Sequence, residues 1–178
     1  AVVQSILDYI PVAKAVGAHQ MLLAFYGDGE LAFGRDKGAV IESLKKVAPA
    51  AEEAGVKLGI ESSLTTEQYI HIIEEVGSSA VNIYLDTCNP YNFYLDTAEQ
   101  ILGLGKHMGQ IHFKEGSHKE GAKDLTEGFC DWDAITAALK AINYDGWAVL
   151  ETSSLSGDPI ADARKNLERA RALASRCQ

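Results

Sequence analysis

Residues 80–89 read AVNIYLDTCN, a short apolar run of strand-forming residues that ends at Asp86. The same form occurs upstream in residues 55–62, GVKLGIES, and downstream in residues 146–151, GWAVLE. Between these runs, apolar residues recur every three or four positions, which predicts amphipathic helices. The chain therefore alternates predicted strands with predicted helices.

The alternation extends over the whole chain. Each predicted strand contains a short run of apolar residues. The predicted strands are residues 21–25, 56–60, 80–85, 108–113 and 146–150. The predicted helices share an apolar face and are residues 2–17, 37–54, 66–76, 95–104, 131–142 and 158–175, and a polar loop is expected at residues 114–130. Strict alternation with short connections favours right-handed βαβ units and a parallel sheet.

Two α/β architectures have this pattern. One is an open, doubly wound five-stranded sheet of the flavodoxin type. The other is part of a (β/α)8 barrel, a fold that typically needs about 250 residues. The length of 178 residues, taken by itself, favours the open sheet.

The composition is that of a chain that folds around an apolar core. Hydrophobic residues make up 47% of the chain and charged residues 23%, which excludes a disordered chain. The formal net charge of −9 argues against nucleic acid as a partner, because a nucleic-acid-binding surface concentrates positive charge. No apolar run is long enough for a transmembrane helix, so we expect no membrane partner. The three scattered cysteines fit a reducing compartment, so we expect a cytoplasmic protein.

Four consecutive predicted strands carry a ligand-type residue at or beside their carboxyl ends, namely Glu61, Asp86, His112 and Glu151. In either parallel architecture, active sites form at this edge of the sheet. Each of these residues by itself is equally well explained as a helix cap, a solvated loop residue or a core histidine. If the four converge, three carboxylates need a cation or protons to offset their repulsion. Three carboxylates and an imidazole match the ligands of Mn²⁺, Mg²⁺ or Co²⁺, and Zn²⁺ also fits, so we expect one divalent metal ion.

Three further residues are candidates for substrate binding. Lys114 follows His112 by two positions, so strand alternation points both side chains the same way, and its charge suits a developing oxyanion or a phosphate. The simpler interpretation is a surface lysine. Asn89 suits a substrate hydroxyl, or it starts the turn before Pro90. His118 reaches the site from the loop, or it is a solvated loop residue.

Five segments, in order, resemble the landmarks of the xylose isomerase-like TIM-barrel superfamily, and within it most closely the sugar phosphate isomerase/epimerase family. These segments are GVKLGIES, YLDTCN, QIHFKEG, LTEGFCDW and YDGWAVLETS. The resemblance implies that Glu61, Asp86, His112 and Glu151 bind one divalent metal ion, with Mn²⁺ as the first expectation. It also implies that Glu61 and Glu151 act as acid and base. Two departures leave the substrate open, because many ketose epimerases carry His at Asn89 and often carry Arg near His118.

The resemblance also implies a different account of the chain length. Members of the family have eight strands, and the pattern in this chain begins at the helix before the fourth. We therefore expect a partial (β/α)8 TIM barrel, with strands four to eight and their helices present and the first three βα units missing. Residues 1–178 are then expected to be a single domain, the C-terminal portion of the barrel. Whether a secretion signal precedes Ala1 is left open.

The function implied by the resemblance is that of a metal-dependent isomerase or epimerase of a sugar or sugar phosphate. Such an enzyme works on a small carbohydrate by proton transfer through a cis-enediolate. One alternative is a lyase or dehydratase of keto-sugars or keto-inositols on the same scaffold. A second alternative is a DNA-repair nuclease similar to endonuclease IV. The segment YLDTCN resembles the Asp-Thr-Cys-His stretch of that family, although Asn89 stands where the family has histidine. A third is a barrel fragment without activity, whose open sheet edges would favour pairing with another copy of the chain.

Overall fold

The computed structural model describes residues 2–31, 37–117 and 121–177. These residues form two compact units. The first comprises the chain up to Tyr84 together with His107–Gly109, and the second comprises Leu85–Lys106 and the chain from Gln110 onward. The sequence-based prediction of a single domain stays a prediction.

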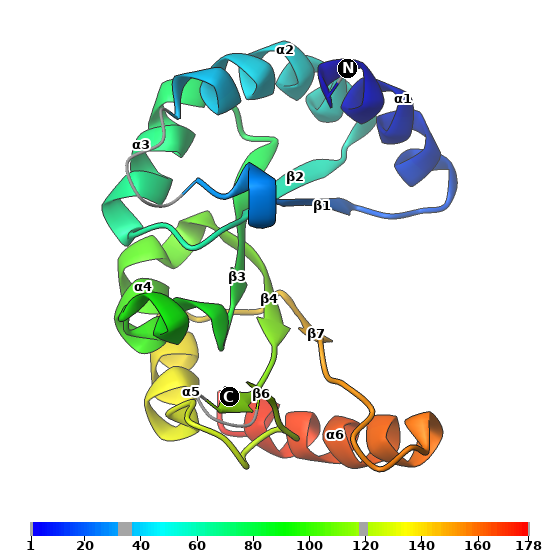
Figure 1. Ribbon diagram of the computed structural model, residues 1–178. Coiled ribbons are helices and arrows are strands. Elements are labelled where there is room, and N and C mark those ends of the chain that lie inside the picture. The colour runs from blue at the N-terminus through cyan, green and yellow to red at the C-terminus, as the bar shows by residue number, and fades with distance from the viewer. Residues whose placement is uncertain (1, 32–36, 118–120, 178) are drawn as a thin grey trace. The chain divides into compact units, whose positions relative to one another are not determined.

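The first unit alternates helices and strands as the sequence predicts (Figure 1). Its elements are α1 (Val2–Ala15), β1 (Gln20–Ala24), the 3-10 turn η1 (Gly27–Gly29), α2 (Gly38–Ala54), β2 (Lys57–Glu61), α3 (Thr66–Val76) and β3 (Val81–Asp86), whose last two residues belong to the second unit. The α1 helix continues through Pro11. Helices α1 and α2 pack against each other on one side of β1 and β2 (Figure 1).

Local sequence determines where the helices of the first unit begin and end. The Thr65 side chain accepts a hydrogen bond from the Gln68 backbone N–H, and the Gln68 side chain accepts one from the Thr65 N–H, so α3 starts with a capping box. Helices α2 and α3 end at Gly55 and Gly77, whose φ angles of 72° and 65° are left-handed. Glycine adopts this conformation without the clash that a Cβ would cause.

A pair of amide side chains lies within the sheet of the first unit. Gln20 Nε2 donates to Asn82 Oδ1 at 2.7 Å, and Asn82 Nδ2 donates to Gln20 Oε1 at 3.0 Å. A Cβ added at Gly59 would collide with Gln20, and one added at Gly109 would collide with Asn82. Both neighbouring strands therefore carry glycine where the pair needs space.

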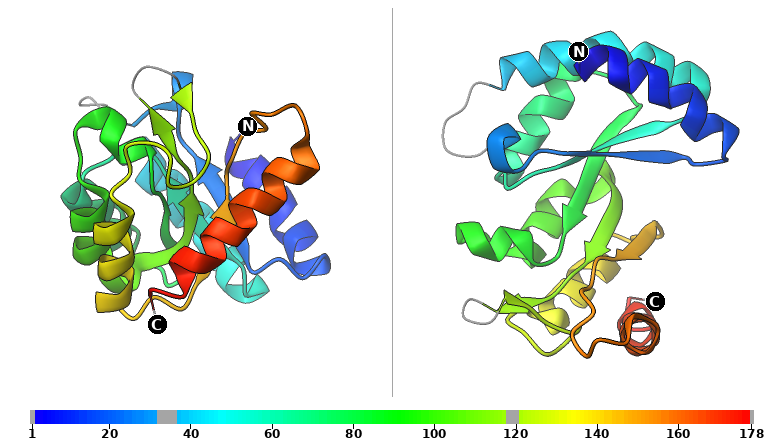
Figure 2. Two further views of the ribbon diagram at one scale, coloured as in Figure 1. Left: turned by 90° about the horizontal axis from the view of Figure 1, so that it is seen from below. Right: turned by 45° about the vertical axis from the view of Figure 1, so that its right-hand side comes forward.

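The second unit contains the remaining elements. They are the 3-10 turns η2 (Asn89–Phe93) and η3 (Gly105–His107), with α4 (Thr97–Leu104), β4 (Met108–Phe113), β5 (Gly116–Ser117), β6 (Gly121–Ala122), α5 (Trp132–Ala141), β7 (Trp147–Leu150) and α6 (Pro159–Ala174). The last residue of η3 and the first two residues of β4 belong to the first unit. Helix α4 begins two residues later than predicted, because the Asp96 side chain caps it by accepting from the Glu99 N–H. The segment predicted as a loop includes the short antiparallel pair β5–β6. Helices α4 and α5 lie side by side (Figure 2).

The order of strands in the sheet decides between the two predicted architectures. The order is β1-β2-β3-β4-β7, the order of these strands along the chain. The pairs β1–β2, β2–β3 and β4–β7 are parallel. A flavodoxin-type sheet places strands out of chain order, so the open sheet that length alone favoured is wrong. Strands in chain order are those of a (β/α)8 barrel, which confirms the expected partial barrel. Within the described residues, none of the helices combines the length and the apolar character needed to cross a membrane.

Candidate metal centre

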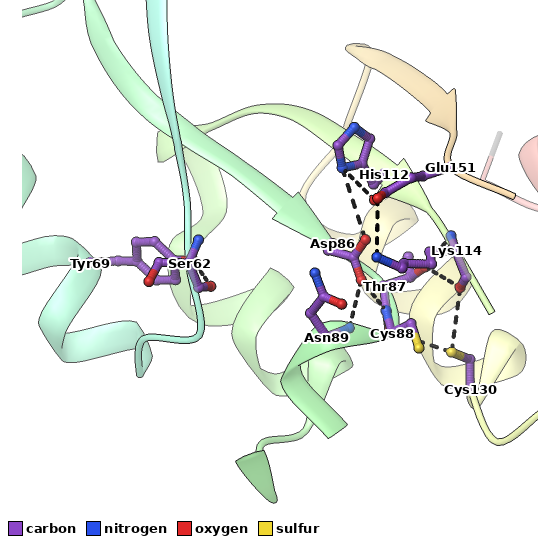
Figure 3. Close-up of polar contacts among 10 residues, drawn as sticks. All are labelled: Ser62, Tyr69, Asp86, Thr87, Cys88, Asn89, His112, Lys114, Cys130 and Glu151. Carbon is purple, nitrogen blue, oxygen red and sulfur yellow. Dashed lines mark hydrogen bonds and ion pairs between the residues drawn. The ribbon is translucent and has the colours of Figure 1, made fainter. Parts of the chain in front are cut away.

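Three of the predicted ligand residues come together in the second unit. Asp86 is the last residue of β3, His112 is the next-to-last residue of β4, and Glu151 directly follows β7. His112 Nδ1 lies 3.1 Å from Glu151 Oε2 and 3.9 Å from Asp86 Oδ2 (Figure 3). One ligand atom of each residue lies within 4.8 Å of those of the others. The convergence follows from parallel pairing, which brings the carboxyl ends of neighbouring strands to one edge.

The turn after β3 fixes the orientation of the Asp86 carboxylate. Its Oδ1 accepts hydrogen bonds from the backbone N–H groups of Cys88 at 2.7 Å and Asn89 at 2.6 Å. These two bonds occupy one oxygen and direct the other, Oδ2, toward His112 (Figure 3). The carboxylate is buried, so its negative charge is poorly solvated and favours a nearby cation.

Lys114 supplies a positive charge at the same place. Its Nζ lies 3.1 Å from Glu151 Oε1, so Glu151 contacts Lys114 through one oxygen and His112 through the other. The Lys114 side chain is about one-third exposed and that of Glu151 about one-half, and solvent weakens the attraction between them. The pair nevertheless places a cation directly beside a carboxylate that is a candidate acid or base.

Glu61 belongs to the first unit, where it is the last residue of β2 and is buried. Its backbone C=O accepts a hydrogen bond from Phe25 N–H at 2.8 Å. Both backbone groups of the next residue, Ser62, bond to the Tyr69 hydroxyl. The Ser62 N–H donates to that hydroxyl at 2.9 Å, and the Ser62 C=O accepts a hydrogen bond from it. These bonds between Ser62 and Tyr69 (Figure 3) therefore fix the direction of the chain after β2 within its own unit.

The donors of this centre fit a divalent cation. Asp86 and Glu151 offer hard carboxylate oxygens and His112 an imidazole nitrogen, which together suit Mn²⁺, Mg²⁺, Co²⁺ or Zn²⁺. The nearby Cys130 does not offer a thiolate. A hydrogen bond with Cys88, and after it burial, holds the pKa of the Cys130 thiol well above its usual range (Figure 3). The Cys130 thiol therefore stays protonated near neutral pH.

Two of the three predicted substrate-binding residues line the same cleft. Asn89 and Lys114 line one cleft of about 190 Å³ together with Glu151. The cleft also includes Asn92 and Ser153, whose polar side chains suit a hydroxylated molecule. His118 lies outside the described residues.

Two residues that support the centre were not predicted from the sequence. Thr87 bonds to Lys114 through its hydroxyl. Glu115 accepts hydrogen bonds from the backbone N–H groups of Gly116 and Cys130 and from the indole N–H of Trp132. A signal for Glu115 exists in the sequence. If His112 and Lys114 point one way, strand alternation points Glu115 the opposite way, beside buried Phe113, where a carboxylate needs internal partners.

Known proteins of similar sequence include several epimerases. A D-psicose 3-epimerase of Enterocloster bolteae is 31% identical over 138 residues, which is 73% of this chain and 44% of that protein. A 2-epi-5-epi-valiolone 7-phosphate 2-epimerase of an Actinoplanes species is 28% identical over 127 residues, which is 70% of this chain and 47% of that protein. The chain thus spans less than half the length of these two relatives.

A solved structure shows the same fold. The structure of an L-ribulose 3-epimerase matches with a TM-score of 0.82 at 22% identity, covering 98% of this chain and 67% of that one. The family described as "Xylose isomerase-like TIM barrel" matches residues 1–173. These findings confirm the resemblance and the partial TIM barrel expected from the sequence. Since the family match spans nearly all of its residues, this chain belongs to the xylose isomerase-like TIM-barrel family.

Proposed function

We propose that this chain carries the metal-binding and proton-transfer centre of a sugar isomerase or epimerase. The observation that supports this proposal most directly is the convergence of Asp86, His112 and Glu151 at the ends of three strands. The similarity to D-psicose 3-epimerase supports a small carbohydrate as the substrate. Net charge of −9 argues against nucleic acid.

The proposed metal ligands are Asp86, His112 and Glu151, with Glu61 as the fourth. Glu61 is the acidic residue that ends β2, and β2 is next to β3 in the sheet order. Mn²⁺ is our first choice of metal, and Mg²⁺, Co²⁺ and Zn²⁺ have compatible ligand preferences. A divalent ion in such a centre polarises a substrate carbonyl and so acidifies the neighbouring C–H bond.

The side chains then have separate roles in a proton transfer. Glu151 removes the proton from the carbon beside the carbonyl, leaving a cis-enediolate of the substrate. Glu61 delivers a proton to the opposite face of that carbon, which inverts it. Lys114, next to Glu151, offsets the negative charge of the enediolate. Asn89 and His118 bind the hydroxyl groups of the sugar.

The surroundings of the protein are also part of the proposal. Cys88, Cys130 and Cys177 are free thiols. Free thiols are typical of reducing compartments, which supports a cytoplasmic location. Assembly with a second copy is a further proposal, because β1 and β7 stand at the two ends of the sheet order.

Exchange of substrate hydrogen with solvent tests the proposed function. The 178-residue chain, loaded with Mn²⁺ or Co²⁺, is incubated in D2O with D-psicose or L-ribulose, and deuterium at C3 is measured by NMR. We expect incorporation by the unaltered chain and a loss of about 10³-fold in Glu151→Gln at saturating metal. Glu168→Gln, on the exposed surface of α6, is the matched control and should exchange at the unaltered rate.

Two results would contradict the proposal. One is a chain that binds the metal but exchanges no hydrogen with either ketose. The other is full exchange in Glu151→Gln, which would remove Glu151 from the proton transfer. A titration calorimetry measurement of metal affinity for both variants separates loss of the ion from loss of the base.

A further inference from the structure

Thr87 occupies a structural position between two strands that carry candidate ligands. It directly follows Asp86 at the end of β3, and its exposed fraction is 0%. Its backbone N–H donates to the C=O of His112 in β4 at 3.0 Å. Thr87 therefore connects, through the main chain, the residue after one ligand with a second ligand.

The Thr87 hydroxyl makes a second connection, to Lys114. Oγ1 donates to the Lys114 C=O at 2.8 Å and accepts from the Lys114 N–H at 2.9 Å (Figure 3). One hydroxyl thus satisfies both polar groups of the Lys114 peptide backbone. In a regular sheet a neighbouring strand would do this through its own main chain, so a side chain continues the pairing beyond the point where β3 ends.

Thr87 is itself held firmly. Its C=O accepts from the Thr97 hydroxyl at 3.0 Å and from the Cys130 thiol at 3.5 Å. Thr97 is the first residue of α4 and is fully buried. The hydroxyl that faces Lys114 consequently extends from a residue whose own backbone is fixed on both its N–H and its C=O side.

We propose that Thr87 is a positioning residue that fixes the backbone of Lys114, and through it the place of the Lys114 ammonium beside Glu151. This inference rests on the proposed function for the role of Lys114 in turnover. The bond from Thr87 N–H to His112 does not involve the side chain, so this bond should remain when the hydroxyl is removed. Loss of the hydroxyl should displace Lys114 and leave metal binding intact.

Two substitutions isolate the hydroxyl. Thr87→Val keeps the shape of the side chain and removes both bonds to Lys114, whereas Thr87→Ser keeps the hydroxyl and removes a methyl group. The matched control is Thr136→Val. Thr136 is also a buried threonine, whose hydroxyl donates within α5 to the Trp132 C=O at 2.7 Å and to the Asp133 C=O at 3.3 Å. It reproduces the loss of a buried hydroxyl hydrogen bond.

Three measurements are made on each variant of the full chain. The first is the exchange rate of the Lys114 backbone amide by NMR, which does not depend on activity. The second is Co²⁺ affinity and the visible spectrum of the Co²⁺ form. The third is kcat and KM with D-psicose. For Thr87→Val we expect at least about 10-fold faster amide exchange, an unchanged Co²⁺ spectrum, and about 10-fold lower kcat with little change in KM.

Thr87→Ser should restore the amide protection and kcat to near the unaltered values, and Thr136→Val should change neither. The proposal is overturned if Thr87→Val leaves both the Lys114 amide exchange and kcat unchanged, if Thr87→Ser fails to restore them, or if Thr136→Val has the same effect. If the unaltered chain turns over no ketose, the proposed function fails instead. The Lys114 amide then still decides whether Thr87 positions this residue.

Discussion

Replacing Glu115 with glutamine keeps the size of a buried side chain but removes its negative charge. Glu115 is 2% exposed. Its Oε1 accepts from the Gly116 N–H at 3.0 Å and the Cys130 N–H at 3.1 Å, and its Oε2 accepts from Trp132 Nε1 at 2.6 Å. In all three of these hydrogen bonds the carboxylate is the acceptor and an N–H group is the donor.

The magnitude of the effect follows from this donor count. An amide has one accepting oxygen, so the introduced glutamine can keep the two backbone donors only by turning its NH2 group toward the indole N–H. That loses one bond to a charged group, about 1.5–3 kcal/mol, and leaves two buried donors facing each other, about 1–3 kcal/mol more. We expect Glu115→Gln to lower the free energy of unfolding by about 3 kcal/mol.

Urea denaturation followed by circular dichroism at pH 7 measures this loss. Glu168→Gln, exposed on α6, should change the unfolding free energy by less than about 0.5 kcal/mol. Trp132→Phe removes the indole donor and keeps a ring against Phe113, with which Trp132 makes an edge-on contact at 5.1 Å between centroids. Both substitutions remove the same hydrogen bond between Glu115 and Trp132. The double variant Glu115→Gln/Trp132→Phe should therefore lose about 1 kcal/mol less stability than the sum of the two single losses. A loss below about 1 kcal/mol in Glu115→Gln, or strict additivity with Trp132→Phe, would refute this reasoning.

Two further predictions concern stability. Lys165 and Asn166 hydrogen-bond to Asp124 and hold the pKa of its carboxyl below the usual range, Lys165 being the larger cause. The stabilisation by the ionised Asp124 carboxylate is present above the unfolded pKa of about 4 and is lost as the pH falls through the lower folded pKa. Asp124→Asn should therefore be less stable than the unaltered chain at pH 7 by about 2 kcal/mol. The variant should also lose less stability on acidification. Urea titrations at several pH values check this, and equal acid sensitivity of both chains would contradict it. Thr65→Ala should destabilise the chain by about 1 kcal/mol through loss of the α3 cap, measured by the same titration, whereas Thr65→Ser should be nearly neutral.

The elements could be predicted from the sequence because their signals are local. Glycines at the ends of α2 and α3 and the threonine before α3 act on residues within one helical turn. The start of α4 was predicted too early, since Asp96 serves as a cap although apolar Leu95 precedes it. The β5–β6 pair has two residues per strand and no apolar alternation, so no periodic signal marks it.

The choice of architecture and the support of the site depend on contacts between distant residues. Chain length favoured an open sheet, whereas strand order, set by which strands pair, excludes it. Asp86 and His112 could be predicted because each stands at a strand end. The role of Thr87 could not be predicted, because it depends on hydrogen bonds to a residue 27 positions away. Nothing in the local sequence distinguishes Thr87 from a threonine in an ordinary turn.

The two tryptophans of the chain have contrasting surroundings. Trp132 is 6% exposed, whereas Trp147, the first residue of β7, is 76% exposed. An indole in water emits at longer wavelengths than one shielded from water, so Trp147 is an intrinsic fluorescent reporter on the last strand of the sheet order. In Trp132→Phe it is the sole indole. A blue shift of its emission with rising protein concentration would then mark the covering of β7 by another molecule, without any attached dye.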